Sequence, residues 1–126
     1  MKYKITVLPG DGVGPEVMKA ALAVLNEIGR LFGVAFSLTT ELIGGCSYEK
    51  HGVVLTSDIL EACRKADAVL LGAVGGPEWD SLPHKSKPET ALLRLRKELG
   101  LYSNLRPATV STHLLENSPL RSEVIQ

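Results

Sequence analysis

The residues best suited to chemistry lie between Pro88 and Gly100, where an acid, two leucines and an arginine recur at helical spacing. Positions i, i+3, i+4 and i+7 are occupied by Glu89, Leu92, Leu93 and Arg96. This spacing places all four along one face of a helix, in a stripe about 10 Å long at about 1.5 Å per residue. Such a face fits a small molecule with an alkyl group and a carboxylate, because the arginine fork binds both carboxylate oxygens.

The same residues also allow a purely structural interpretation. Leu92 and Leu93 would then join Leu95 and Leu99 in the core while the arginines are solvated, and the pattern alone favours this alternative. In the first interpretation, Arg106 on the next extended segment supplies a second fork for the carboxylate.

Positive charge is concentrated around this helix although the chain as a whole is neutral. Lys plus Arg and Asp plus Glu each total 14, yet six of the cations lie between residues 84 and 106, where only Glu89 and Glu98 oppose them. The overall balance argues against a nucleic-acid-binding module, whereas the local excess indicates a small anion as partner. A solvated helix face with ion pairs is the alternative, and charge alone favours it.

Two glycine-rich turns, at residues 10–14 and 72–76, follow predicted strands. The first is not a dinucleotide fingerprint, because Pro15 occupies the third glycine position and no acid lies about 20 residues further on. Glycine leaves the backbone amides open to a ligand, but a simple tight turn explains both clusters equally well. Trp79, after the second turn, is more commonly a packing residue than a ligand contact.

Three apolar, β-branched segments predict strands at residues 2–8, 34–43 and 66–74. Helical spacing and capping residues predict helices from Pro15 to Gly29 or Gly33, over 58–65 and over 88–99. Residues 44–52 form a loop or short helical turn, residues 101–110 are extended, and a last helical turn starts at Ser118-Pro119. Strands that alternate with helices indicate an α/β fold with a largely parallel sheet and flanking helices. Ligands of such sheets gather beyond the carboxyl ends of the strands.

Composition limits the class of protein. A chain of 126 residues forms one domain, or one domain and part of another. Its 44% hydrophobic and 22% charged residues are typical of a globular protein, and its apolar runs are too short to span a bilayer. The N-terminus lacks the apolar core of a signal peptide. Cys46 and Cys63 form no disulfide framework or metal-ligand pattern, so we expect a cytoplasmic location.

Four motifs resemble those of the β-decarboxylating dehydrogenases, the family of the isocitrate and isopropylmalate dehydrogenases. They are LPGDGVGPEV at residues 8–17, GAVGGPEWD at 72–80, LLRLRK at 92–97 and LYSNLRP at 101–107. The resemblance extends over essentially the whole chain, in register, and is greatest to members that act on 3-isopropylmalate in leucine biosynthesis. It implies NAD-dependent oxidation and decarboxylation of this substrate with a Mg or Mn ion.

The resemblance also implies roles for individual residues. It implies that Arg96 and Arg106 bind substrate carboxylates and that Leu92 and Leu93 contact the isopropyl group. It also implies that NAD is contacted by Glu89 and by a preceding segment, which consists of Gly75, Gly76, Pro77, Glu78, Trp79 and Asp80. Isocitrate dehydrogenases have polar residues where Leu92 and Leu93 stand, but such contacts contribute only about 1–3 kcal/mol of discrimination. Homoisocitrate, tartrate and isocitrate therefore remain alternatives, as does a non-catalytic module that binds a small anion.

Other parts of the family's machinery are expected beyond Gln126. By resemblance these are the catalytic tyrosine and lysine, the metal-binding aspartates and most of the interface of a homodimer; this chain contributes no catalytic residue and no metal ligand. Residues 1–99 are expected to form the N-terminal part of a first domain, and residues 100–126 the start of a second. We therefore expect an N-terminal fragment of the enzyme.

Incubated alone with 3-isopropylmalate, NAD and Mg²⁺, the 126-residue chain is expected to form no NADH, because the catalytic residues are expected elsewhere. NADH absorbance measures the reaction, and a full-length relative in the same assay provides the positive control. Turnover by the chain alone would contradict the expectation.

Overall fold

The computed structural model describes residues 1–107 and residue 111, and it contains three strands and four helices within them. Their order along the chain is β1 (Lys2–Gly10), α1 (Gly14–Phe32), β2 (Ala35–Thr40), α2 (Gly45–His51), α3 (Ser57–Lys65), β3 (Ala68–Ala73) and α4 (Glu89–Glu98). Two single 3₁₀ turns, η1 (Pro77–Trp79) and η2 (His84–Ser86), lie between β3 and α4.

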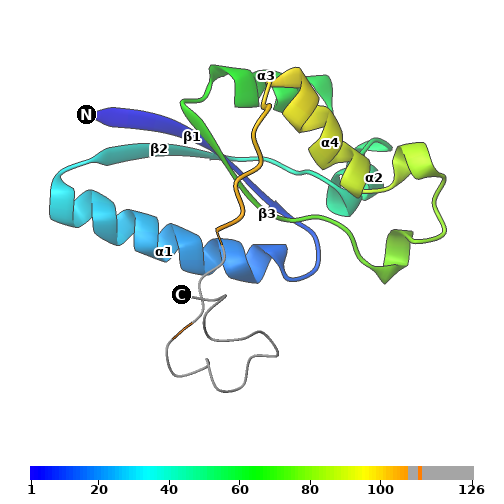
Figure 1. The fold of residues 1–126 in the computed structure, drawn as a ribbon, viewed down its shortest axis with the longest axis horizontal. Coiled ribbons are helices and arrows are strands. Elements are labelled where there is room, and N and C mark those ends of the chain that lie inside the picture. The colour runs from blue at the N-terminus through cyan, green and yellow to red at the C-terminus, as the bar shows by residue number, and fades with distance from the viewer. Residues whose placement is uncertain (108–110, 112–126) are drawn as a thin grey trace, which may run out of the picture.

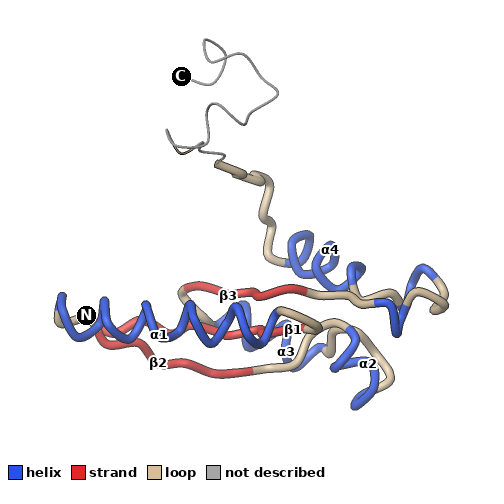
Figure 2. Tube along the Cα trace, turned by 90° about the horizontal axis from the view of Figure 1, so that it is seen from below, coloured by secondary structure: helices blue, strands red, loops and turns tan. Residues whose placement is uncertain are grey.

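The strands form one parallel sheet in the order β2-β1-β3, with β1 in the centre. Helix α1 lies on one face of the sheet, and α3 and α4 lie on the other (Figures 1 and 2). The predicted α/β fold with a parallel sheet is therefore confirmed. Because all strands run in the same direction, the two glycine-rich turns and the start of α2 lie at one edge of the sheet, where the carboxyl ends meet.

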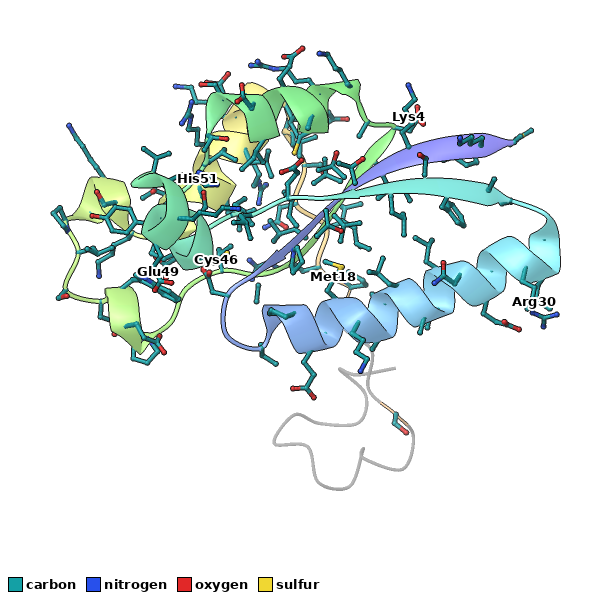
Figure 3. All side chains as sticks on the ribbon, turned by 180° about the vertical axis from the view of Figure 1, so that it is seen from behind. Lys4, Met18, Arg30, Cys46, Glu49 and His51 are labelled. Atoms are coloured by element: carbon teal, nitrogen blue, oxygen red, sulfur yellow. The ribbon has the colours of Figure 1, made fainter. Side chains whose placement is uncertain are left out.

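Successive side chains of β1 point to opposite faces of the sheet, so the core consists of two clusters, one on each face. Ile5 and Val7 pack with Met18 of α1, which points from that helix toward the sheet (Figure 3). Leu8, on the opposite face, is fully buried in a larger cluster from α3, α4 and the loops beside them. Members of this cluster are Leu8, Ile43, Leu55, Ile59, Leu60, Cys63, Ala91 and Leu95. Both faces of β1 and β3 are covered, which explains why β3 is apolar throughout.

Helix α1 ends as predicted, with Gly33 in the left-handed region at φ 65°. The face that packs on the sheet consists of Met18, Leu22 and Leu25, whereas Val17 and Val24 are 52% and 61% exposed. The helix was therefore predicted correctly; its buried face is known only from the structure, because apolar residues surround much of the helix.

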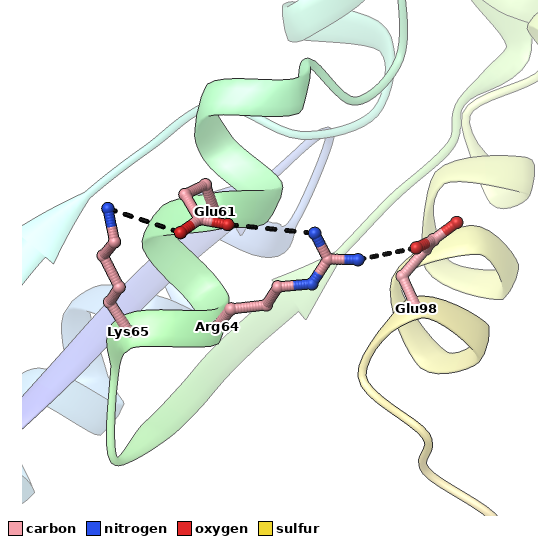
Figure 4. Close-up of polar contacts among 4 residues, drawn as sticks. All are labelled: Glu61, Arg64, Lys65 and Glu98. Atoms are coloured by element: carbon pink, nitrogen blue, oxygen red, sulfur yellow. Dashed lines mark hydrogen bonds and ion pairs between the residues drawn. The ribbon is translucent and has the colours of Figure 1, made fainter.

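Helix α3 begins where the sequence predicts, and it is fixed to α4 at its other end. The Thr56 hydroxyl accepts a hydrogen bond from the Ile59 amide at 3.3 Å, an N-cap that satisfies one free donor of the first turn. Arg64 bridges to Glu98 of α4 at 2.7 Å, while Glu61 also pairs with Lys65 (Figure 4). These pairs are exposed and contribute little free energy, but they join two helices on the same face of the sheet.

Several predicted segments differ from the structure. Strand β2 is shorter than the predicted 34–43, because the chain leaves the sheet after Thr40 and carries Ile43 into the core. The 3₁₀ turns η1 and η2 were not predicted. Residues 101–107 are exposed throughout and form no strand, which does not contradict their prediction as extended chain. The predicted turn at Ser118-Pro119 and residues 108–110 lie outside the described residues. Within the described part of the chain, no helix is long and apolar enough to cross a membrane.

Replacing Gly14 by Ala should lower the free energy of unfolding by about 3 kcal/mol, the upper end for overpacked sites. A Cβ on Gly14 would collide with the Pro9 carbonyl and approach the Ala73 amide to 2.9 Å, and neither group is a flexible side chain. Gly33→Ala is the control: its Cβ would meet nothing within 4 Å, so only backbone strain of about 1 kcal/mol remains. Denaturant unfolding of both variants measures the difference, and equal losses would contradict the prediction.

Candidate functional site

The centre of the candidate site is the carboxylate of Asp11, which joins the loops that follow all three strands. Its Oδ2 atom accepts hydrogen bonds from the amides of Gly45 at 2.7 Å and Gly75 at 2.9 Å, and Oδ1 accepts from Cys46 at 2.8 Å. The residue is only 4% exposed. A buried carboxylate is stable when several donors satisfy it, and here three backbone amides do so.

Local sequence explains why these amides are available. Gly45 and Cys46 begin α2, where the first backbone amides of a helix lack partners within the helix. The N-cap residue Gly44 has no side chain that could satisfy them, so Asp11 fills this role from another loop, where its negative charge also favours the helix N-terminus. Gly75 has φ 106°, a conformation that is rare for other residues and that occurs where its amide donates to Asp11.

The two glycine-rich turns lie side by side, as the parallel arrangement of β1 and β3 requires. Gly10 is in register with Ala73, and the Asp11 amide donates to the Ala73 carbonyl at 2.7 Å. A Cβ on Gly12 would lie 3.6 Å from the Gly75 carbonyl. The turns therefore form one continuous backbone surface beyond the sheet.

Helix α4 brings its acid to this surface. A Cβ built on Gly75 would lie 2.6 Å from Oε1 of Glu89, so the Glu89 carboxylate is close to the second glycine turn. Leu93 is 63% exposed, and Leu92 and Arg96 are half-buried.

The other side of α4 is the side that packs. Ala91 is fully buried and Leu95 is 4% exposed, while Leu99 packs against the same cluster. The structural alternative for this helix was thus right for Leu95 and Leu99 and wrong for Leu93. Leu92 lies outside both core clusters. The acid, the leucines and the arginine consequently remain on a face that is available for contact.

The structure does not bring Arg106 to this face. The residue lies in the exposed segment 101–107, which extends away from α4 and the sheet (Figure 2). Among the described residues, Arg106 has no hydrogen bond or ion pair that would hold it near Arg96. Its role as a second fork remains a prediction.

Trp79 has a packing role in the segment assigned to the cofactor. Its indole ring occupies the space where a side chain on Gly45 would lie, and the ring edge is 3.0 Å from where a Cβ on Gly76 would be. The ring therefore covers the start of α2 and supports the turn η1. This contact agrees with the commoner interpretation of Trp79, and a contact between Trp79 and a ligand remains a prediction.

The two cysteines are poorly placed for nucleophilic chemistry. Burial raises the pKa of the Cys46 thiol, and the nearby charge of Asp11 raises it further; burial likewise raises the pKa of Cys63, with a contribution from Glu41. Both remain thiols at neutral pH, and the thiolate is the reactive form. Cys46 lies at the start of α2 (Figure 3), and its thiol donates to the Ile43 carbonyl at 3.2 Å.

Sequence reasoning did not identify Asp11 as a site residue. Its amide partners lie 34, 35 and 64 positions away, so no local pattern marks them as neighbours. The available signal was a single acid enclosed by glycines between a strand and a helix, where a carboxylate can bind backbone amides in place of a ligand.

Comparison with known proteins identifies relatives along the whole chain. The family model described as isocitrate/isopropylmalate dehydrogenase matches residues 4–126. The 3-isopropylmalate dehydrogenase of Chlorobaculum tepidum is 56% identical over 126 residues, which cover 100% of this chain and 36% of that protein. The protein of the same name from Moorella thermoacetica is 55% identical over 124 residues, covering 98% and 35%. The chain thus spans about a third of the length of these curated relatives.

Solved structures show the same similarity. The isocitrate dehydrogenase of Methylococcus capsulatus matches with a TM-score of 0.70 and 32% identity, over 85% of this chain and 29% of that one. A β-decarboxylating dehydrogenase of Thermococcus kodakarensis matches with a TM-score of 0.63 and 38% identity, over 79% and 27%. The similarity therefore includes both the sequence and the arrangement of strands and helices.

Asp11→Asn should lower the free energy of unfolding by about 3 kcal/mol, because a buried acceptor is lost and an amide donor is turned toward backbone donors. Asp67→Asn is the matched control, since Asp67 is exposed and accepts a single backbone bond, from Lys4 at 2.7 Å; about 1 kcal/mol is expected there. Thermal or denaturant unfolding measures both. A loss at Asp11 no larger than that at Asp67 would show that the three bonds do not secure the loops.

Proposed function

Because the chain belongs to the isocitrate/isopropylmalate dehydrogenase family, we propose that it forms part of an enzyme that oxidises 3-isopropylmalate with NAD and releases carbon dioxide. The reaction would belong to leucine biosynthesis and take place in the cytoplasm. The observation that carries the proposal is the free face of α4, where Glu89 lies beside the Gly75 turn and an exposed Leu93 precedes Arg96.

On this face, two parts of the substrate would be bound by different side chains. The guanidinium of Arg96 would bind a carboxylate through two parallel hydrogen bonds. Leu92 and Leu93 would contact the isopropyl group, which gains free energy by leaving water. A substrate with a third carboxylate in place of the alkyl group would leave that charge against leucine, so isocitrate is disfavoured. The same argument applies to homoisocitrate, but homoisocitrate, tartrate and isocitrate remain the alternative substrates, because the discrimination by two apolar side chains is small.

The glycine turn and the residues after it would contact the cofactor. The proposed NAD segment is Gly75, Gly76, Pro77, Glu78, Trp79 and Asp80, together with Glu89. Gly75 already adjoins the Glu89 carboxylate, so this carboxylate would lie near the nicotinamide, whose oxidised ring is positive. Packing of Trp79 on Gly45 supports the fixed position of the segment.

The metal ion would depend on residues outside the described part of the chain. Within residues 1–107 and 111, no group of three or more His, Cys, Asp or Glu side chains could hold an ion, and the carboxylate of Asp11 is occupied by three amides. When bound, a Mg or Mn ion supplies charge stabilisation for the oxygen that becomes ketone and then enolate.

We also propose the wider organisation that the family suggests. Residues 1–99 would form the N-terminal part of one domain, and residues from Gly100 onward would begin another. The change from a packed helix to the exposed segment 101–107 supports a boundary at this point. The complete enzyme would act as a homodimer.

A chimera tests the proposal directly: residues 1–126 replace the matching region of the Chlorobaculum tepidum relative. NADH formation with 3-isopropylmalate, NAD and Mg²⁺ is expected, and Arg96→Gln should lower kcat/KM by about 100-fold, because a carboxylate loses its charged partner. Lys97→Gln removes a neighbouring exposed charge and should leave kcat/KM within about twofold.

Substrate choice is read from the same chimera. Leu93→Gln should reduce the preference for 3-isopropylmalate over isocitrate by about 10-fold. Faster oxidation of isocitrate than of 3-isopropylmalate by the unmutated chimera would overturn the proposed substrate. Equal effects of the Arg96 and Lys97 variants would overturn the role of the α4 face.

A further inference from the structure

A second feature of α4 is a cleft of about 360 Å³ on a different side of the helix. Thr90 and Arg94 line it, and these positions are offset by one residue from Glu89 and Leu93, so they project from another side. Further lining residues come from α2, from the chain that follows it and from η2. The lining consists of Tyr48, residues 52–55, His84–Ser86, Thr90 and Arg94.

The cleft is positively charged without an opposing acid. Lys85 and Arg94 contribute positive charges, while no Asp or Glu occurs in the lining. The Nη1 atom of Arg94 donates to the Leu55 carbonyl at 3.1 Å, which fixes the guanidinium at the wall but leaves its charge unneutralised.

Three other cations of the described residues, Arg30, Arg64 and Lys65, have carboxylate partners. Arg64 and Lys65 bind the carboxylates of Glu98 and Glu61 (Figure 4), whereas no carboxylate of the described residues lies within ion-pair distance of Arg94. An arginine held by a carbonyl retains several donors of its planar fork for an oxyanion.

The remaining wall is apolar. Leu55 is 1% exposed and forms part of the core, Val54 is half-buried against the same cluster, and Tyr48 is half-buried. A concave site with an apolar wall and a few convergent polar groups is typical of small-molecule binding. The volume also falls in the usual range for such sites, which is about 300–1,000 Å³.

We propose that this cleft binds a small organic oxyanion, a carboxylate or phosphate group on an apolar body, separately from the ligands of the Glu89–Arg96 stripe. Arg94 and Lys85 would bind the oxyanion, and the side chains of Val53 and Val54 would contact the apolar body. The proposal gives a role to two cations of the 84–106 stretch that the proposed dehydrogenase function leaves unused.

Titration of the ¹⁵N-labelled 126-residue chain with phenyl phosphate and with benzoate tests the proposal, and uncharged benzamide is the matched control. Saturable amide shifts are expected at residues 53–55, 84–86 and 94 with at least one of the two anions, and the stronger binder identifies the preferred oxyanion. Lys85→Gln and Arg94→Gln should each weaken binding by about 5-fold or more, as charge-assisted bonds are lost. Lys97→Gln, outside the lining, should leave it within about twofold.

Three results would overturn the proposal: shifts that map outside the cleft, benzamide shifts equal to those of benzoate, or equal weakening by Lys85→Gln and Lys97→Gln. Arg94→Gln could disturb the fold through the lost bond to Leu55. In that case Lys85→Gln tests the proposal, because the only hydrogen bond of Lys85 to a described side chain is made by its backbone carbonyl, which the substitution keeps. Failure here leaves the proposed dehydrogenase function intact, since that function depends on the other face of α4.

Discussion

One buried carboxylate determines how the edge of the sheet is built. Asp11 is fixed at the end of β1, the central strand, and it binds amides that follow β2 and β3. A buried charge is costly unless it is fully hydrogen-bonded, so any arrangement of these loops that breaks the three bonds is disfavoured. The glycines around it follow from this requirement, because Gly44 and Gly75 adopt left-handed backbone angles and side chains on Gly44 or Gly45 would collide with Asp11 or Trp79.

The position of α4 depends on this constraint from one side and on the core from the other. The Gly75 turn, held by Asp11, lies against Glu89 at the first turn of the helix. Ala91 and Leu95 are buried on the opposite side with residues of α3. With its packed face fixed, the helix has no freedom to rotate, and Leu93 and Arg96 are directed away from the core. The order of acid, apolar group and guanidinium is therefore a property of the fold and not only of the helix.

Local patterns predicted the type of each main element, because their causes are local. Thr56 caps α3, Gly33 ends α1, and the apolar run of β3 suits a strand covered on both faces. Patterns failed where neighbours in space decide. Leucines occur on both sides of α4, so spacing could not show that Leu95 packs while Leu93 is exposed, and apolar residues around α1 hid its buried face in the same way. The similarity of four motifs to a known family led us to favour the ligand-binding interpretation of the α4 stripe, which periodicity alone did not favour.

The outer strands of the described sheet, β2 and β3, each present a row of backbone donors and acceptors on the side away from β1. Such borders accept additional strands without rearrangement of the existing ones. Because Asp11 and its three amide partners lie beyond the carboxyl end of the central strand, new strands can pair with β2 or β3 while the glycine turns keep their hydrogen bonds. The architecture is therefore modular: the sheet can widen in either direction while the loops around Asp11 stay unchanged.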